Sequence, residues 1–232
     1  MHIETWLLLL ESVLLAFTIA LLLLSIKEGR ARNALLLEVQ KATKTLTRLE
    51  YFLVVAESMD EAKKEVLGSI TGRMPHGGDI RRTREIVAAI RKAAKKGVRL
   101  RYLLPRFPDR LHIGYHYSRA GAEVRFSTCP VAHDLRYMVV DDRVVVLGVP
   151  EAVGKAEATK KGYRIVSEGL AAVLREHFES CWQKSTPYEQ YMKEVLQQSG
   201  ATPQSLAREL SIDPQELARI VSLESPAGLQ GS

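Results

Sequence analysis

The fold of this chain is decided by one stretch, AHDLRYMVVDDRVVVLG, at residues 132–148. Two apolar runs rich in β-branched residues, 137–140 and 144–147, flank the polar triplet at 141–143. Apolar runs of this length separated by polar turn residues are typical of a β-hairpin. The stretch therefore predicts two antiparallel strands that turn at residues 141–143.

Outward from this hairpin, strands and helices alternate along the chain. The apolar spacing predicts helices at residues 80–96, 109–120 and 168–183, and strands at 98–104, 123–126 and 163–166. Strands that alternate with helices are typical of an α/β sheet with parallel crossovers. We therefore expect a mixed sheet flanked by helices, in a domain that covers residues 60–185.

The charged residues of the central stretch carry a family resemblance. Asp134, Arg136, Asp141 and Gly148 have the spacing of the motif HxKx4Dx6GS and so resemble the phospholipase D superfamily. The segments AAKKGVRLRYLL, AGAEVRF and LREHFESCWQ resemble the same half domain in order and spacing. In that family the histidine attacks phosphorus, the lysine binds the phosphate and the aspartate orients the histidine.

This sequence departs from the motif at the residues that perform the chemistry. Asp134 stands at the histidine position and Arg136 at the lysine position, and Val149-Pro150-Glu151 replaces the polar end of the motif. His133 is one residue early, so on a regular strand its side chain points to the opposite face. The resemblance implies a phospholipase-D-like half domain that has lost hydrolysis, a pseudoenzyme. The alternative is an active phosphodiesterase or nuclease that uses His133, Arg136 and Asp141.

A phosphate-binding site is expected at the carboxyl ends of the strands, where ligands lie in α/β sheets. Arg136 is the main candidate because a guanidinium binds phosphate through two parallel hydrogen bonds. The other candidate ligand-binding residues are Asp134, His133, Arg73, His76 and Arg106. No cofactor or metal is expected. Only one half domain is present, so the resemblance implies a homodimer.

The N-terminal residues predict a membrane anchor. Residues 6–26, WLLLLESVLLAFTIALLLLSI, form a run that would reach about 31 Å as a helix, enough to cross a bilayer. Lys27, Arg30 and Arg32 follow it, which places the rest of the chain in the cytoplasm. We expect a single-pass protein of the cell membrane with a short outer tail at residues 1–5.

Residues 27–59 continue with apolar residues at three- and four-residue spacing, which predicts a juxtamembrane helix. This helix could pair with a copy of itself or lie against its own domain.

The charge of the chain indicates which kinds of partner it could bind, and its cysteines indicate the redox state of its compartment. The net charge is +6, and residues 73–110 hold twelve Lys or Arg against three acids. Such a surplus favours anionic lipid headgroups or nucleic acid as partners. Cys129 and Cys181 are far apart and have no metal-binding spacing, so we expect reduced thiols and no disulfide.

The C-terminal residues 186–224 predict a small all-α, helix-turn-helix-like module. Asp213 and Pro214 have the order of a helix cap and first turn. Residues that would pack its two helices together are Ala207, Leu210, Ile212, Leu217 and Ile220. The second helix offers few donors to DNA, so a protein partner and nucleic acid both remain open. Residues 225–232 are expected to be a disordered tail.

Overall fold

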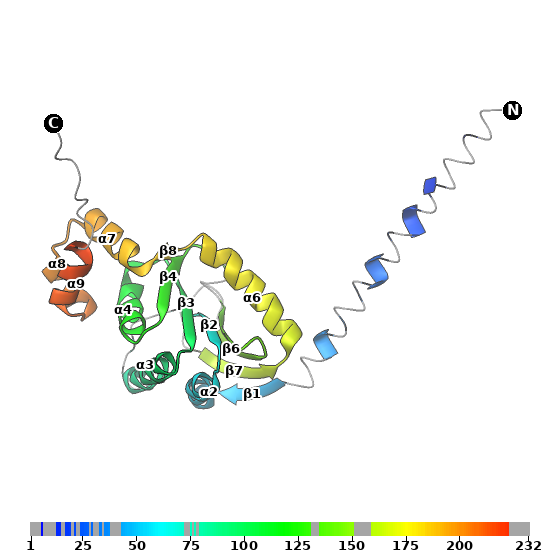
Figure 1. Ribbon diagram of the computed structural model, residues 1–232, viewed down its shortest axis with the longest axis horizontal. Coiled ribbons are helices and arrows are strands. Elements are labelled where there is room, and N and C mark those ends of the chain that lie inside the picture. Colours follow the sequence, from blue (N-terminus) through cyan, green and yellow to red (C-terminus); the bar gives the residue numbers. More distant parts are fainter. Residues whose placement is uncertain are drawn as a thin grey trace. The chain divides into compact units, whose positions relative to one another are not determined.

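The computed structural model describes residues 43–71, 75, 77, 79–130, 135–150 and 159–222, together with scattered positions between 6 and 37. The chain divides into two compact units, 1–42 and 43–232 (Figure 1). Four of the predicted site residues lie outside the described residues: Arg73, His76, His133 and Asp134. The tail predicted at 225–232 lies outside them too.

In the N-terminal unit, the described positions between residues 6 and 37 are helical. Within the part of the chain that is described, no helix is both long enough and apolar enough to cross a membrane. Many positions of the predicted span 6–26 lie outside that part, so the membrane anchor stays a prediction.

The second unit is built on an eight-stranded mixed sheet, in the order β1-β7-β6-β5-β2-β3-β4-β8. Neighbours β2–β3 and β3–β4 are parallel, and the other pairs are antiparallel. The α/β prediction is therefore confirmed. The strands are β1 (Thr43–Thr47), β2 (Glu65–Ser69), β3 (Arg99–Pro105), β4 (Glu123–Ser127), β5 (Arg136–Val140), β6 (Val144–Pro150), β7 (Thr159–Val166) and β8 (Thr186–Pro187).

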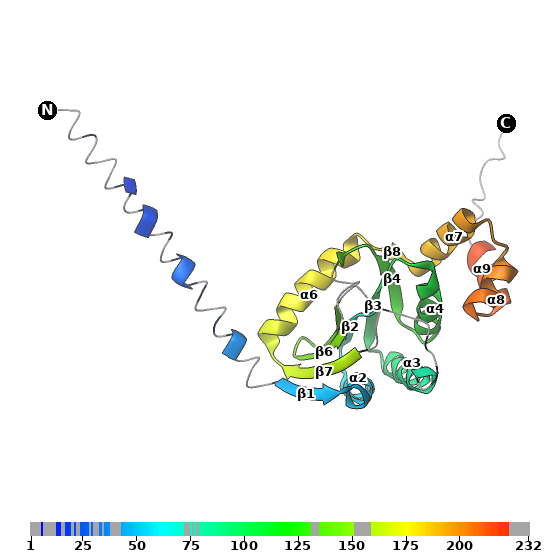
Figure 2. The ribbon, with the colours of Figure 1, turned by 180° about the vertical axis from the view of Figure 1, so that it is seen from behind.

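Helices cover both faces of the sheet (Figures 1 and 2). On one face lie α2 (Arg48–Glu61), α3 (Asp79–Lys95) and α4 (Leu111–Arg119), the last preceded by a 3-10 turn, η1 (Pro108–Arg110). The other face is covered by α6 (Glu168–Gln183). The side chains of β5 point alternately to these two faces. Met138 and Val140 pack in the core beneath α2 and α3, while Tyr137 contacts His177 of α6.

The predicted hairpin forms where the sequence placed it. Strands β5 and β6 pair in the register Arg136↔Gly148 through Val140↔Val144. Asp141 and Asp142 in the turn have φ of 48° and 56°, a left-handed backbone that aspartate tolerates better than most residues. The polar triplet thus makes a tight turn that a β-branched residue would strain.

The helix predicted at residues 27–59 is interrupted by a strand at residues 43–47, and residues 48–59 are helical as predicted. Residues 43–47 form β1, an edge strand that pairs with β7, because Thr43, Thr45 and Thr47 alternate and favour extended backbone. Thr47 then caps α2: its side chain accepts from the backbone of Glu50, whose carboxylate accepts from the backbone N–H of Thr47 at 2.8 Å. The α/β unit therefore begins at residue 43, before the boundary expected at 60.

The prediction of reduced cysteines is also contradicted. A disulfide joins Cys129, just after β4, to Cys181 in the last turn of α6, with 6.1 Å between the two Cα atoms. Fifty-two residues separate the two cysteines. Only the tertiary fold brings them together, by laying α6 beside the end of β4.

The C-terminal helices are α7 (Tyr188–Ser199), α8 (Pro203–Leu210) and α9 (Pro214–Ser222). Four of the residues expected to pack α8 against α9 are buried: Ala207, Leu210, Ile212 and Leu217. They belong to the same apolar core as the sheet. His112 of α4 also contacts the carbonyl oxygen of Leu210 through Nδ1 at 2.6 Å. The expected boundary near residue 186 does not separate two cores.

Candidate functional site

Parallel strands β2, β3 and β4 end at the same edge of the sheet, and β5 begins there. In the register, Ser69 at the end of β2 lies beside Tyr137, and Pro105 at the end of β3 lies beside Ser127 of β4. Arg136 is the first residue of β5 and is half-buried. The structure therefore places Arg136 at the edge where a ligand was expected.

Next to Arg136, two glycines make room for a buried tyrosine. Gly148 of β6 and Gly162 of β7 are register partners on neighbouring strands. A Cβ atom on Gly148 would lie 2.9 Å from Cζ and from the hydroxyl of Tyr51, and one on Gly162 would lie 2.6 Å from its Cδ2. Tyr51 of α2 thus lies directly over both glycines, with its hydroxyl over Gly148, the partner of Arg136.

Burial and a neighbouring charge change the pKa of Tyr51 in opposite directions. Burial raises the pKa of Tyr51 to about 12, although the positive charge of Arg136 lowers it in part. The hydroxyl therefore keeps its proton at neutral pH. The protonated hydroxyl of Tyr51 thus lies over Gly148, the register partner of the cation Arg136.

Arg106, another predicted ligand-binding residue, faces the C-terminal helices. Its guanidinium forms an ion pair with Glu194 of α7 and lies 5.3 Å from the ring centroid of Tyr191. Its backbone N–H donates to the carbonyl oxygen of Ser127 at 3.0 Å. The observed role of Arg106 is to connect the end of β3 to α7.

Asp141 lies at the other end of β5 from Arg136. Its carboxylate accepts hydrogen bonds from the backbone N–H groups of Lys63, Lys64 and Glu65, at 2.8, 2.8 and 2.9 Å. Burial alone would raise the pKa of Asp141, but these bonds and the charge of Lys64 outweigh it, so the pKa lies below its usual value. The structure therefore uses the motif's aspartate to fix the start of β2 and does not bring it to Arg136.

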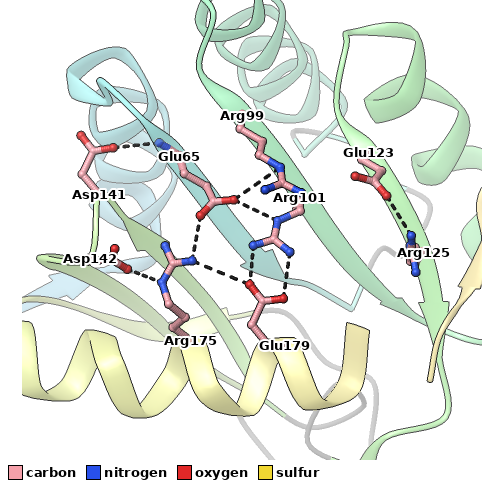
Figure 3. A network of polar contacts seen from close by, with 9 residues as sticks. All are labelled: Glu65, Arg99, Arg101, Glu123, Arg125, Asp141, Asp142, Arg175 and Glu179. Atoms are coloured by element: carbon pink, nitrogen blue, oxygen red, sulfur yellow. Dashed lines mark hydrogen bonds and ion pairs between the residues drawn. The ribbon is translucent and has the colours of Figure 1, made fainter. Parts of the chain in front are cut away.

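Sequence reasoning missed a network of ion pairs beneath α6 (Figure 3). Arg101 of β3 donates to Glu65 at 2.9 Å and forms a forked pair with Glu179 of α6. Arg175, one turn earlier on α6, contacts Glu65 at 2.8 Å and pairs with Asp142. These hydrogen bonds from Arg101 hold the pKa of Glu179 below its usual value, against the effect of burial.

This network explains part of the basic surplus in residues 73–110. Arg101 counts toward that surplus in the sequence, yet its side chain is only 5% exposed and its charge is used inside the fold. The signal that could have revealed it is on α6, where Arg175 and Glu179 lie four residues apart between apolar residues.

No group of three or more metal-ligating side chains is found within the described residues. His112 and His116 lie edge to face with ring centroids 4.5 Å apart. Burial and the neighbouring His112 lower the pKa of His116. His112 also contacts the carbonyl oxygen of Leu210 at the end of α8, so it is part of the contact between α4 and the C-terminal helices.

Comparison with known proteins gives a likeness in structure alone. No family model matches the sequence, and no curated protein matches it. Nuc from Salmonella typhimurium, a phospholipase D family member, superposes with a TM-score of 0.50 at 18% identity, over 63% of this chain and 97% of Nuc. TrmBL2, an archaeal chromatin protein, gives 0.44 at 19% identity, over 70% of this chain and 63% of TrmBL2. NucT from Helicobacter pylori gives 0.48 at 12% identity, over 62% of this chain and 98% of NucT. The similarity to Nuc shows that this chain contains a phospholipase-D-like fold.

Proposed function

We propose that the α/β unit binds a phosphate-bearing ligand at the edge formed by Arg136 and Tyr51, and does not cleave it. The observation that carries this proposal is the position of Arg136, at the carboxyl ends of the parallel strands in a phospholipase-D-like sheet. A guanidinium suits the oxygens of a phosphate, and a protonated hydroxyl beside it adds a neutral donor.

The absence of cleavage follows from the residues at the motif positions. The sequence has Asp134 where the resemblance requires a histidine nucleophile. Asp141 is bound to the backbone at the other end of β5, and Tyr51 keeps its proton. These observations support a binding role at this site.

One probe can test both halves of the proposal. Bis(para-nitrophenyl) phosphate is a phosphodiester that releases a coloured product when it is cleaved, so binding and hydrolysis are measured on the same compound with the full chain. We expect saturable binding without colour release. Arg136→Met should weaken binding by at least tenfold, which corresponds to about 1.4 kcal/mol.

Arg143→Met is the matched control, because Arg143 is an exposed arginine at the opposite end of the same hairpin. Equal loss of affinity in both variants would contradict a site at Arg136. Colour release that disappears in His133→Ala would establish the alternative, an active phosphodiesterase.

The nucleic-acid alternative is best tested by substitution in α9. Deleting residues 200–232 would uncover Val195 and Leu196, two buried residues of α7, because α7 packs against α9. Gln215 and Arg219 are exposed on α9, so Gln215→Ala with Arg219→Ala leaves that core covered. Salt-sensitive oligonucleotide binding that is lost in this double variant and kept in Arg136→Met would favour a nucleic-acid-binding regulator.

The proposal also includes a membrane anchor and a homodimer. We infer that residues 6–26 anchor the chain in the cell membrane, with the α/β unit on the cytoplasmic side near anionic headgroups. The homodimer implied by the family resemblance is part of this proposal and is tested by light scattering on the chain in detergent.

A further inference from the structure

The two sulfurs of the disulfide have different surroundings. Cys181, on the buried face of α6, is 3% exposed, whereas Cys129, in the segment that follows β4, is partly exposed. We therefore expect an incoming thiol to attack the sulfur of Cys129, the less buried residue, and not that of Cys181. This asymmetry determines which sulfur is attacked and which one leaves.

A histidine lies against the buried sulfur. His177 precedes Cys181 by one turn of α6, and its Nε2 is 3.6 Å from the Sγ of Cys181. Its other ring nitrogen, Nδ1, is 3.1 Å from the hydroxyl of Tyr137 on β5. The imidazole is thus held at both nitrogens, with Nε2 directed at the sulfur that would leave.

We propose that Cys129–Cys181 is a thiol–disulfide exchange site for a small thiol or dithiol, with His177 as the general acid. A thiolate of the reductant attacks Sγ of Cys129, forming a mixed disulfide and breaking the bond to Cys181. The electron pair goes to Sγ of Cys181, which takes a proton from Nε2 of the imidazolium. The second thiolate of a dithiol then displaces Cys129 and closes its own disulfide, so the chain gains two electrons.

The position of Cys181 in its helix explains why a proton donor is needed. Cys181 lies in the last turn of α6, where the helix dipole disfavours a negative charge. A thiolate is a poor leaving group at this position, and protonation by His177 removes the charge as the bond breaks. The contact between His177 and Cys181 therefore matters more here than it would near the start of a helix.

The fold keeps the two cysteines near each other without the disulfide. Ion pairs from Arg101 and Arg175 hold α6 to the sheet (Figure 3). The guanidinium of Arg125 on β4 lies 4.6 Å from the ring centroid of Trp182, next to Cys181. Reduction therefore leaves the cysteines placed for oxidation again. Disulfides in reducing compartments are usually transient and redox-active, so the proposed cytoplasmic location is compatible with this role.

The first test locates the attacked sulfur in the full-length wild-type chain. Air-oxidised protein is mixed with excess reduced glutathione, quenched with acid and mapped by mass spectrometry of its peptides. We expect glutathione on Cys129 and a free thiol at Cys181. Glutathione on Cys181, equal amounts on both cysteines, or two free thiols in the air-oxidised protein would overturn the proposal.

The second test addresses His177. Reduction by dithiothreitol should be at least about 100-fold slower in His177→Gln than in the wild type, the loss expected when a general acid is removed. Glu176→Gln, an exposed neighbour on the same helix, is the control and should react at the wild-type rate. Equal rates in wild type and His177→Gln would refute the role of His177. If His177→Gln does not fold, the peptide mapping of the wild type still decides where exchange occurs.

Discussion

At the scale of single residues, the candidate site depends on two glycines, which have no side chain to occupy the space of Tyr51. Gly148 and Gly162 have no Cβ, and the ring of Tyr51 occupies the space that two methyl groups would fill. Tyr102 lies over Gly68 of β2 in the same way, with 2.4 Å between its Cε1 and the position of a Cβ. The glycines on three strands thus allow aromatic rings to approach the sheet closely, beside Arg136 in the case of Tyr51.

Gly162→Ala is expected to lower the free energy of unfolding by about 1–3 kcal/mol, the usual cost of overpacking a core. The added methyl group would clash with Cδ2 and Cβ of Tyr51, which lie near the helix backbone and cannot easily move. The measurement is urea denaturation of the single variants Gly162→Ala and Tyr51→Ala and of the double variant. If the two effects simply add, the contact is not what makes the glycine necessary.

Asp141→Asn should reduce the free energy of unfolding by about 1–3 kcal/mol at neutral pH, because the carboxylate accepts three backbone hydrogen bonds. The pKa of Asp141 is lowered in the fold, so its contribution is complete above the unfolded value of ~3.9 and is lost as pH falls through the folded value. The difference between wild type and variant should therefore vanish in acid.

Asp142→Asn is the control in the same turn, since Asp142 also has a positive φ and its side chain is 60% exposed. The Asp142→Asn substitution should lower the free energy of unfolding by less than about 1 kcal/mol. Denaturation curves across the acidic range measure both variants. A constant difference between wild type and Asp141→Asn at every pH would show that the ionised carboxylate is not responsible.

At the scale of elements, α6 is held to the sheet by charge as well as by apolar contact. Phe178 and Trp182 of α6 stack at 5.2 Å, and the guanidinium of Arg101 lies 5.4 and 5.3 Å from their ring centroids. The same guanidinium is paired with Glu65 and Glu179. One arginine therefore connects β2, β3 and α6.

Arg101→Met should destabilise the protein by about 2–4 kcal/mol, because it leaves two partly buried carboxylates with one shared arginine, Arg175. Arg99→Met is the matched control on the same strand. Its side chain is 64% exposed and pairs with Glu65 at 3.7 Å, so its loss should cost under about 1 kcal/mol. The stabilities of the Arg101→Met and Arg99→Met variants are compared by thermal and urea denaturation. An equal loss of stability in both would argue against a buried network.

At the scale of the whole molecule, the two units should be separable. Residues 43–232 form one compact unit around the sheet, and residues 1–42 form the other. Removing residues 1–42 leaves β1 and its pairing with β7 intact. The shortened chain should therefore keep its fold and its ligand site.

Deletion of residues 1–42 should release the protein from membranes while leaving its unfolding transition within a few degrees of that of the full chain. The measurement is sedimentation of cell membranes after alkaline extraction, followed by circular dichroism of the soluble product. Full-length protein that is extracted in the same way would contradict the membrane anchor. A shortened chain that does not fold would contradict the independence of the α/β unit.

Local pattern was enough to predict the hairpin, the helices at 80–96 and 168–183, and the mixed sheet, because apolar periodicity and turn residues act over a few neighbours. The position of Arg136 at the carboxyl ends of the parallel strands followed from the same pattern. The strand at 43–47 was missed because Leu46 also fits a helical spacing, and the pairing with β7 that holds the strand extended involves residues far along the chain.

Contacts between residues far apart in the chain were decided by the tertiary structure alone. The disulfide between Cys129 and Cys181, the pairing of Arg101 with Glu65 and Glu179, and the place of Tyr51 over two glycines all join separate elements. Sequence spacing carries no signal for such contacts, because their geometry is set by how strands are ordered and where helices cross the sheet. The spacing of Asp141 in the motif was read from the sequence in the same way. Its three backbone partners could not be, because they lie at or just before the start of β2, more than seventy residues earlier.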